Sequence, residues 1–174
     1  MGKLGELTAE IGKGLKFEEY DVYYDHGAAG DHVGRIVSTI EEKYLRRDEL
    51  SQMDIAIVGK DSGKALVLIE IEETNDRPKA LLGDAFGVLV GDYIFFHRKQ
   101  KITVNKHTTL IVLGKSKISD DKRNKVLRKK IMKVKSKLST NNSKIGNVVI
   151  KSFTDEKELS TLLLSEIDKA IKGE

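Results

Sequence analysis

Two apolar runs rich in β-branched residues lie on either side of a short polar turn in the first half of the chain. The runs cover residues 53–58 and 65–71, and the turn between them reads Gly-Lys-Asp-Ser-Gly-Lys. Apolar runs of this length, joined by Gly, Asp and Ser, predict a β-hairpin. The turn resembles a phosphate-binding loop only superficially, because its spacing is one residue short and a strand follows it.

The hairpin carries carboxylates at its open end. Asp54 begins the first strand, and Glu70 and Glu72 end the second. These two ends lie side by side in an antiparallel pair, and alternation of side chains places Glu70 and Glu72 on one face. Three converging carboxylates repel one another unless a cation lies between them, which indicates a divalent metal. The alternative is a solvated sheet end, although Leu66 and Leu68 share the face of Glu70 and a carboxylate there is costly unless paired.

The remaining pattern predicts an α/β layered domain. Helical spacing of apolar residues predicts helices at 4–15, 31–45, 79–93, 120–138 and 156–172. Strands are expected at 17–24, 108–113 and 148–153, with a charged connection at 45–52. In the 79–93 helix, Gly83, Gly87 and Gly91 recur every four residues and predict close packing against another backbone. A hairpin followed by alternating helices and strands indicates one α/β domain over residues 1–174.

Composition limits the classes of protein. The 174 residues include no cysteine, which excludes disulfides and thiolate metal sites. No apolar run is long enough for a transmembrane helix, and the first residues lack the apolar core of a secretory signal. We therefore expect a cytoplasmic protein that does not associate with a membrane. High Lys and Glu content is compatible with a thermophile. The net charge is +4, with a basic segment at 115–137 and an acidic one at 70–76. This distribution of charge would suit the binding of a polyanion next to a metal site.

The order helix, strand, Asp-bearing strand, Glu-x-Glu strand, helix, strand resembles the core of the PD-(D/E)XK nuclease superfamily. The resemblance covers about residues 4–113, with a C-terminal strand and helix extension at about 114–174. It implies a restriction-endonuclease-like fold, which is a three-layer α/β domain with a central mixed sheet flanked by helices. Glu72 stands where the family usually has Lys, as in BamHI-type enzymes, and Met53 rather than proline precedes Asp54.

The resemblance also implies a function. We expect a metal-dependent endonuclease that hydrolyses DNA phosphodiester bonds, with Asp54 and Glu70 as ligands of Mg²⁺ or Mn²⁺. Glu72 is then the base that positions the attacking water. The family often adds a Glu from the preceding helix. Glu10 fits the spacing of archaeal Holliday-junction-resolvase-like members, and Glu41 is its rival. A homodimer is possible by the same analogy.

Basic residues provide candidate contacts to DNA. Arg77 and Lys79 lie next to the acidic segment in the sequence, where phosphates would approach. The 120–138 helix adds Lys122, Arg123, Lys129 and Lys130, although such a charge run is also typical of a merely solvated helix face. The alternative function is that of a catalytically degenerate nuclease-fold protein, which binds nucleic acid or a protein partner without cutting.

Overall fold

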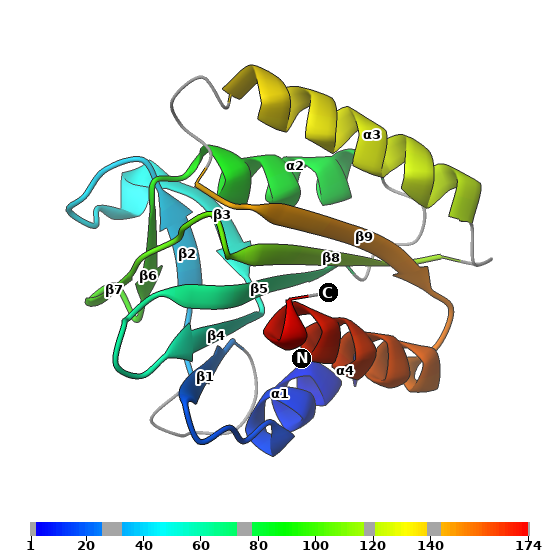
Figure 1. Ribbon diagram of the computed structural model, residues 1–174, viewed down its shortest axis with the longest axis horizontal. Coiled ribbons are helices and arrows are strands. Elements are labelled where there is room, and N and C mark those ends of the chain that lie inside the picture. The colour runs from blue at the N-terminus through cyan, green and yellow to red at the C-terminus, as the bar shows by residue number, and fades with distance from the viewer. Residues whose placement is uncertain (1–2, 26–32, 73–77, 117–120, 139–143, 174) are drawn as a thin grey trace.

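A mixed five-stranded sheet forms the centre of the molecule (Figure 1). The computed structural model describes residues 3–25, 33–72, 78–116, 121–138 and 144–173. The strand order is β1-β4-β5-β8-β9, in which β1, β4 and β5 are antiparallel and β5, β8 and β9 are parallel. These strands are β1 (Tyr20–Tyr24), β4 (Ile55–Gly59), β5 (Ala65–Glu72), β8 (Thr109–Lys115) and β9 (Asn147–Phe153).

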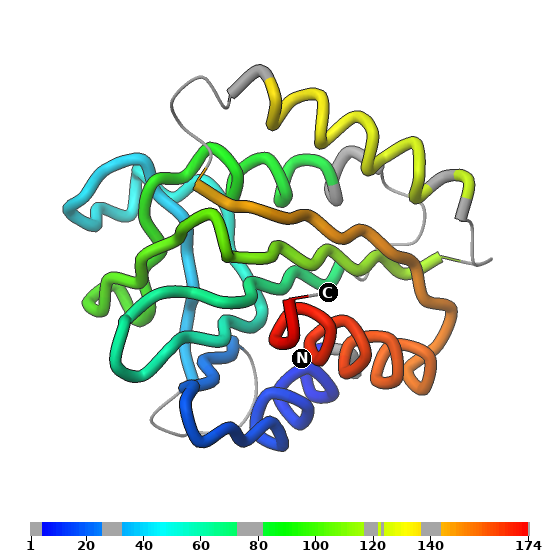
Figure 2. The backbone as a smooth tube through the Cα atoms, viewed as in Figure 1, coloured from blue at the N-terminus to red at the C-terminus, as the bar shows by residue number. Residues whose placement is uncertain are grey.

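Helices cover both faces of this sheet, an arrangement compatible with a three-layer α/β fold. On one face lie α1 (Lys3–Gly14) and α4 (Glu156–Lys172), which run beside each other (Figures 1 and 2). On the other lie α2 (Pro78–Val90) and α3 (Asp121–Leu138). Alternation along β4 serves both layers, since Ile55 packs in the α1/α4 core and Ala56 in the α2/α3 core. None of the described helices is long and apolar enough to cross a membrane.

A second sheet of four strands packs on the α2 side of the first. Its order is β3-β2-β6-β7. Its apolar residues join the core shared with α2 and α3. The strands are β2 (Ile36–Thr39), β3 (Glu49–Met53), β6 (Tyr93–Phe96) and β7 (Gln100–Ile102), and the short 3₁₀ helix η1 (Arg46–Asp48) precedes β3.

Several predicted elements need correction in this region. The helix expected at 31–45 is wrong, because residues 36–39 form β2 and residues 40–43 form a bend. All four residues of β2 are buried, so both faces of the strand are covered and no two-residue alternation marks it. The expected connection at 45–52 contains β3, and the 79–93 helix ends at Val90 before β6. The predicted hairpin, the later strands and the last two helices are confirmed, with shifts of a residue or two.

Gly87 in α2 and Gly91 just after it allow the helix to lie directly on the second sheet. A Cβ at Gly87 would lie 2.5 Å from the Cβ of Ser51 and 2.9 Å from the carbonyl oxygen of Leu50. At Gly91 it would lie 2.9 Å from the Cβ of Ser38. The Ser38 hydroxyl donates to the carbonyl of Gly87 at 2.9 Å. The predicted close packing is confirmed there, whereas a Cβ at Gly83 would have nothing within 4 Å.

We predict opposite effects of alanine at two glycines of one helix. Gly87→Ala should destabilise the protein by about 1–3 kcal/mol, because the methyl group overlaps β3. Gly83→Ala should stabilise it by about 0.5–1 kcal/mol through helix propensity alone. Urea denaturation of both variants measures these changes. Equal effects at the two positions would contradict the packing described for α2.

Candidate acidic site

The β4–β5 hairpin brings Asp54 to the end of β5. Ile55 pairs with Ile69, so Asp54 lies opposite Glu70. The Asp54 amide donates to the carbonyl of Ile69 at 2.9 Å, and its carboxylate accepts from the amide of Ile71 at 2.7 Å. The predicted approach of the two strand ends is therefore confirmed, and the Asp54 side chain is fixed by the backbone of the partner strand.

Glu70 and Glu72 face the layer that contains α2. Their neighbours Ile69 and Ile71 pack in the α1/α4 core, whereas Leu68 packs with Ala85 in the α2/α3 core. Side chains alternate along a strand, so the two carboxylates continue the face of Leu68. Helix α2 places Asp84 above the same strand end, one turn before the tightly packed Gly87.

The charges at this end of the sheet act on one another. The pKa of Glu70 is raised well above its usual range, first by burial and then by the negative charges of Asp54, Asp84, Glu72 and Asp25. The pKa of Asp84 is raised as well, first by burial and then by Glu72 and Asp54. Both directions are expected where burial and like charges disfavour ionisation. We call these five residues the acidic site.

Asp25 and Asp84 were not among the residues selected from the sequence. Asp25 follows β1, whose Tyr24 pairs with Ile55, so its amide meets the carbonyl of Asp54 at 2.8 Å. Its position directly after a predicted strand was a usable signal. Asp84 lies in the middle of α2, and only the packing of that helix on the sheet brings it to Glu72.

A chain of polar side chains anchors Asp25 from the second sheet. Asp25 is only 8% exposed, and its carboxylate accepts a hydrogen bond from the Gln52 amide. The Gln52 oxygen accepts from Arg35 at 3.0 and 3.2 Å, and Arg35 also binds Glu49 at 2.8 Å. Tyr44 donates to Glu49. Because Arg35 occupies the Gln52 oxygen, the amide nitrogen of Gln52 must face Asp25.

The other predicted site residues lie elsewhere or lack a described side chain. Glu10 is exposed on α1, and Glu41 is exposed in the bend after β2. Neither is among the charges that raise the pKa of Glu70. The helix expected to carry Glu41 is absent, so the spacing argument for that residue is wrong.

The predicted DNA-contact residues are only partly described. Arg77 lies outside the described residues, and only the backbones of Lys79 in α2 and Arg123 in α3 are described. Lys122, Lys129 and Lys130 are exposed on α3.

The carboxylate oxygens of the acidic site are chemically suitable ligands for a hard divalent cation. Carboxylate oxygens are the ligands that Mg²⁺ and Mn²⁺ prefer, and a cation would relieve the repulsion that raises the pKa of Glu70. Within the described residues, however, no group of three or more His, Cys, Asp or Glu side chains is arranged to hold a metal ion. The Asp54 carboxylate is instead turned toward the Ile71 amide.

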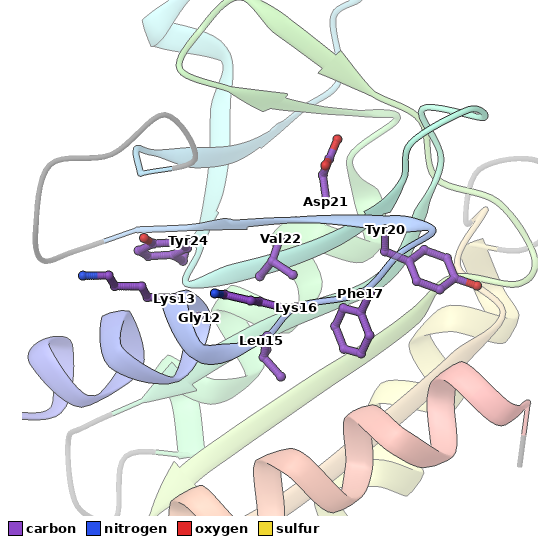
Figure 3. Close-up of a pocket in the computed structure, with 9 residues that line it drawn as sticks. All are labelled: Gly12, Lys13, Leu15, Lys16, Phe17, Tyr20, Asp21, Val22 and Tyr24. Atoms are coloured by element: carbon purple, nitrogen blue, oxygen red, sulfur yellow. The ribbon is translucent and has the colours of Figure 1, made fainter.

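A separate cavity lies on the opposite side of β1. It measures about 460 Å³ and lies between the end of α1 and β1, lined by residues that include Lys13, Lys16, Phe17, Tyr20 and Tyr24 (Figure 3). Val22 points into it, whereas Asp21 points away (Figure 3). Asp25 alternates with Tyr24 and therefore shares the side of Asp21. This cavity is not part of the acidic site.

Comparison with known proteins adds no assignment. No protein-family model, no curated protein and no solved structure matches the chain.

The raised pKa of Glu70 predicts how stability changes with pH. The folded protein holds the Glu70 proton more tightly than the unfolded chain does. Protonation of Glu70 therefore stabilises the fold at low pH, and this stabilisation is lost as pH rises through the raised pKa. In metal-free buffer, Glu70→Gln should therefore stabilise the protein by at least about 1 kcal/mol at about pH 8. The difference should shrink toward about pH 4.

Urea denaturation at several pH values, with a chelator present, measures this effect. Glu18→Gln is the matched control, because Glu18 is exposed before β1 and its replacement should change stability little at either pH. A Glu70→Gln protein that is less stable than the wild type at alkaline pH would contradict the repulsion described here.

Proposed function

We propose that this protein is a metal-dependent endonuclease of restriction-endonuclease-like fold, which hydrolyses DNA phosphodiester bonds at the acidic site. One observation carries the proposal: Glu70 is held at the end of an apolar sheet among four other carboxylates, and its pKa is raised well above the usual range. Like charges held together in this way oppose folding, and carboxylates with perturbed pKa values are concentrated at functional sites. Phosphoryl chemistry is the reaction class that matches an all-oxygen donor set.

The residues take distinct roles in this proposal. Asp54 and Glu70, opposite each other on adjacent strands, are the proposed ligands of Mg²⁺ or Mn²⁺. When bound, such an ion neutralises phosphate charge and lowers the pKa of a water molecule. Glu72, one step along the same face of β5, would accept the proton from the attacking water. Asp84 and Asp25 flank these residues and keep the total negative charge high.

Helix α3 supports a role for a polyanion. Its outward side chains include Lys122, Lys125, Arg128, Lys129, Lys130 and Lys133, all exposed. The helix follows β8, which is parallel to β5, so the chain enters α3 from the end of the sheet that carries Glu70. Exposed lysines near a phosphate path contribute affinity without sequence preference. We propose that α3 binds the DNA backbone and that a homodimer supplies a second site for the other strand.

The second candidate is a DNA-binding protein whose catalytic site is degenerate. Two observations favour it. The described carboxylates do not form a ready metal-ligand group, and Glu72 occupies the position at which the resembled superfamily usually carries lysine. The two candidates share the DNA and differ in metal binding and cleavage.

Cleavage assays separate these candidates. With Mg²⁺ or Mn²⁺, the wild type should cut plasmid or branched DNA. Asp54→Ala and Glu70→Gln should each lower the rate by at least about a hundredfold, because each removes a charge from the reacting centre. Glu18→Gln is the control and should cut at the wild-type rate. A wild-type protein that cuts neither DNA under these conditions excludes the nuclease function.

Metal binding is testable without any cleavage. At about one hundred times its Kd, Mn²⁺ should stabilise the wild type by about 2.7 kcal/mol. The same addition should stabilise Glu70→Gln much less, because a ligand charge is missing. Thermal unfolding with and without Mn²⁺ measures both. Equal stabilisation of the two proteins would show that the ion binds elsewhere.

A further inference from the structure

The turn between β6 and β7 has an unusual backbone. The amide of Lys99 donates to the carbonyl of Phe96 at 3.1 Å, which closes a four-residue turn. The two central residues, His97 and Arg98, have φ values of 51° and 64°. Consecutive left-handed residues define a turn type that strongly favours Asn and Gly. Neither residue here is of that kind, so the turn carries conformational strain.

Contacts of His97 hold this turn against the start of β2. The imidazole lies against Gly34, where a Cβ would overlap the ring, and it donates to the carbonyl of Val33. The His97 amide also donates to the carbonyl of Arg35 at 3.0 Å. Strained residues that the surroundings fix in this way tend to lie at functional sites. These contacts hold the tip of the hairpin in place, and Arg98 and Lys99 are both exposed on it.

The register of the second sheet places this tip near the acidic site. Ile36 pairs with Met53 on one side and with Phe96 on the other. Met53 and Phe96 therefore lie on either side of Ile36, and Asp54 and His97 are the next residues after them in the chain. Adjacent strands are about 4.8 Å apart, so the backbones of Met53 and Phe96, next to Asp54 and His97, are separated by about 10 Å. The β6–β7 hairpin lies at the outer edge of the molecule beyond β2 (Figure 1).

Charge complementarity then selects a ligand. Without a bound metal ion the acidic site repels a phosphate chain, so a strand that lies across it must then be held by positive charges on the flanks. Phosphates of one strand follow each other every 3.4 Å or so along the axis of a duplex, and the 10 Å gap therefore spans about three of them. Within this hairpin, Lys101 is already paired with Glu42 at 2.7 Å, so the phosphate contacts of the hairpin would come from Arg98 and Lys99 in the turn.

We propose that the β6–β7 turn binds backbone phosphates of a nucleic-acid strand beside the acidic site, through Arg98 and Lys99, with His97 fixing the turn. The inference names a substrate contact of the proposed nuclease and rests on that function for its meaning. Its test is binding without metal, so its outcome is independent of cleavage.

The first experiment removes the charge of the turn. The double variant Arg98→Ala/Lys99→Ala should bind short fluorescent DNA, as duplex or single strand, roughly tenfold more weakly than the wild type at moderate salt. The slope of log affinity against log salt should fall by about two. Fluorescence anisotropy in a chelator, over a salt series, measures both quantities.

The matched control removes two lysines from the end of the central sheet that lies away from Glu70. Lys64 begins the approach to β5 and Lys106 precedes β8, and both are exposed. Lys64→Ala/Lys106→Ala has the same net charge as the turn variant and should retain near-wild-type affinity and slope. Equal losses in the two variants would overturn the proposal, and so would a wild type that binds neither form of DNA.

A second variant separates binding from folding. Glycine adopts the φ of Arg98 without strain, so Arg98→Gly should leave the melting temperature unchanged or raise it, while weakening DNA binding severalfold. A purely structural role for Arg98, such as its contact 5.9 Å from the Tyr44 ring centre, predicts a lower melting temperature and unchanged binding. If the wild type binds DNA through this turn but never cuts it, the nuclease proposal fails and this one stands.

Discussion

Repulsion among the carboxylates at the end of β5 is the constraint on which the site depends. Burial and four neighbouring negative charges make the ionised form of Glu70 costly, and the fold nevertheless holds it there. The apolar residues on both faces of the hairpin provide the opposing free energy. Ile55 and Ile57 pack in one core and Ala56 and Val58 in the other, so the hairpin cannot shift register without exposing a buried face. The fixed register therefore keeps the carboxylates at its end close together.

The second sheet strengthens this arrangement from outside the central layer. Glycines at positions 87 and 91 let α2 lie on β2 and β3, and that contact sets the position of Asp84. The same sheet holds Asp25 through Gln52 and Arg35. Asp25 and Asp84 therefore also depend on contacts with the second sheet. The β6–β7 turn belongs to this sheet too, so the same sheet supports part of the acidic site and the proposed phosphate contacts.

This arrangement suits the proposed work on a polyanion. Negative charge concentrated at one strand end favours a cation and opposes a phosphate chain, whereas positive charge on a nearby turn and on α3 attracts one. A strand held by its flanks across a bound cation would be positioned for the proposed hydrolysis. The same geometry without a bound cation would bind DNA and leave it intact.

The hairpin, its three carboxylates and the C-terminal helices could be predicted from the sequence, because their information is local. Apolar runs, a Gly-Asp-Ser turn and helical spacing are properties of neighbouring residues. Strand β2 could not be predicted in this way. It is buried on both faces, and the spacing of its apolar residues together with those around it also fits a helix. Strand β3 was likewise missed, because the segment at 45–52 is charged and the strand that pairs with β3 is not specified by its own residues.

The residues of the acidic site also fall into a group that the local sequence predicts and a group that only tertiary contacts bring together. The sequence by itself determined that Asp54, Glu70 and Glu72 would meet, since a hairpin joins its own two ends. Only the tertiary structure decided that Asp25 and Asp84 complete the cluster. Asp25 arrives through pairing of β1 with β4, and Asp84 through the packing of α2 across glycines. Contacts between distant segments depend on the whole core, and no local pattern of residues specifies them.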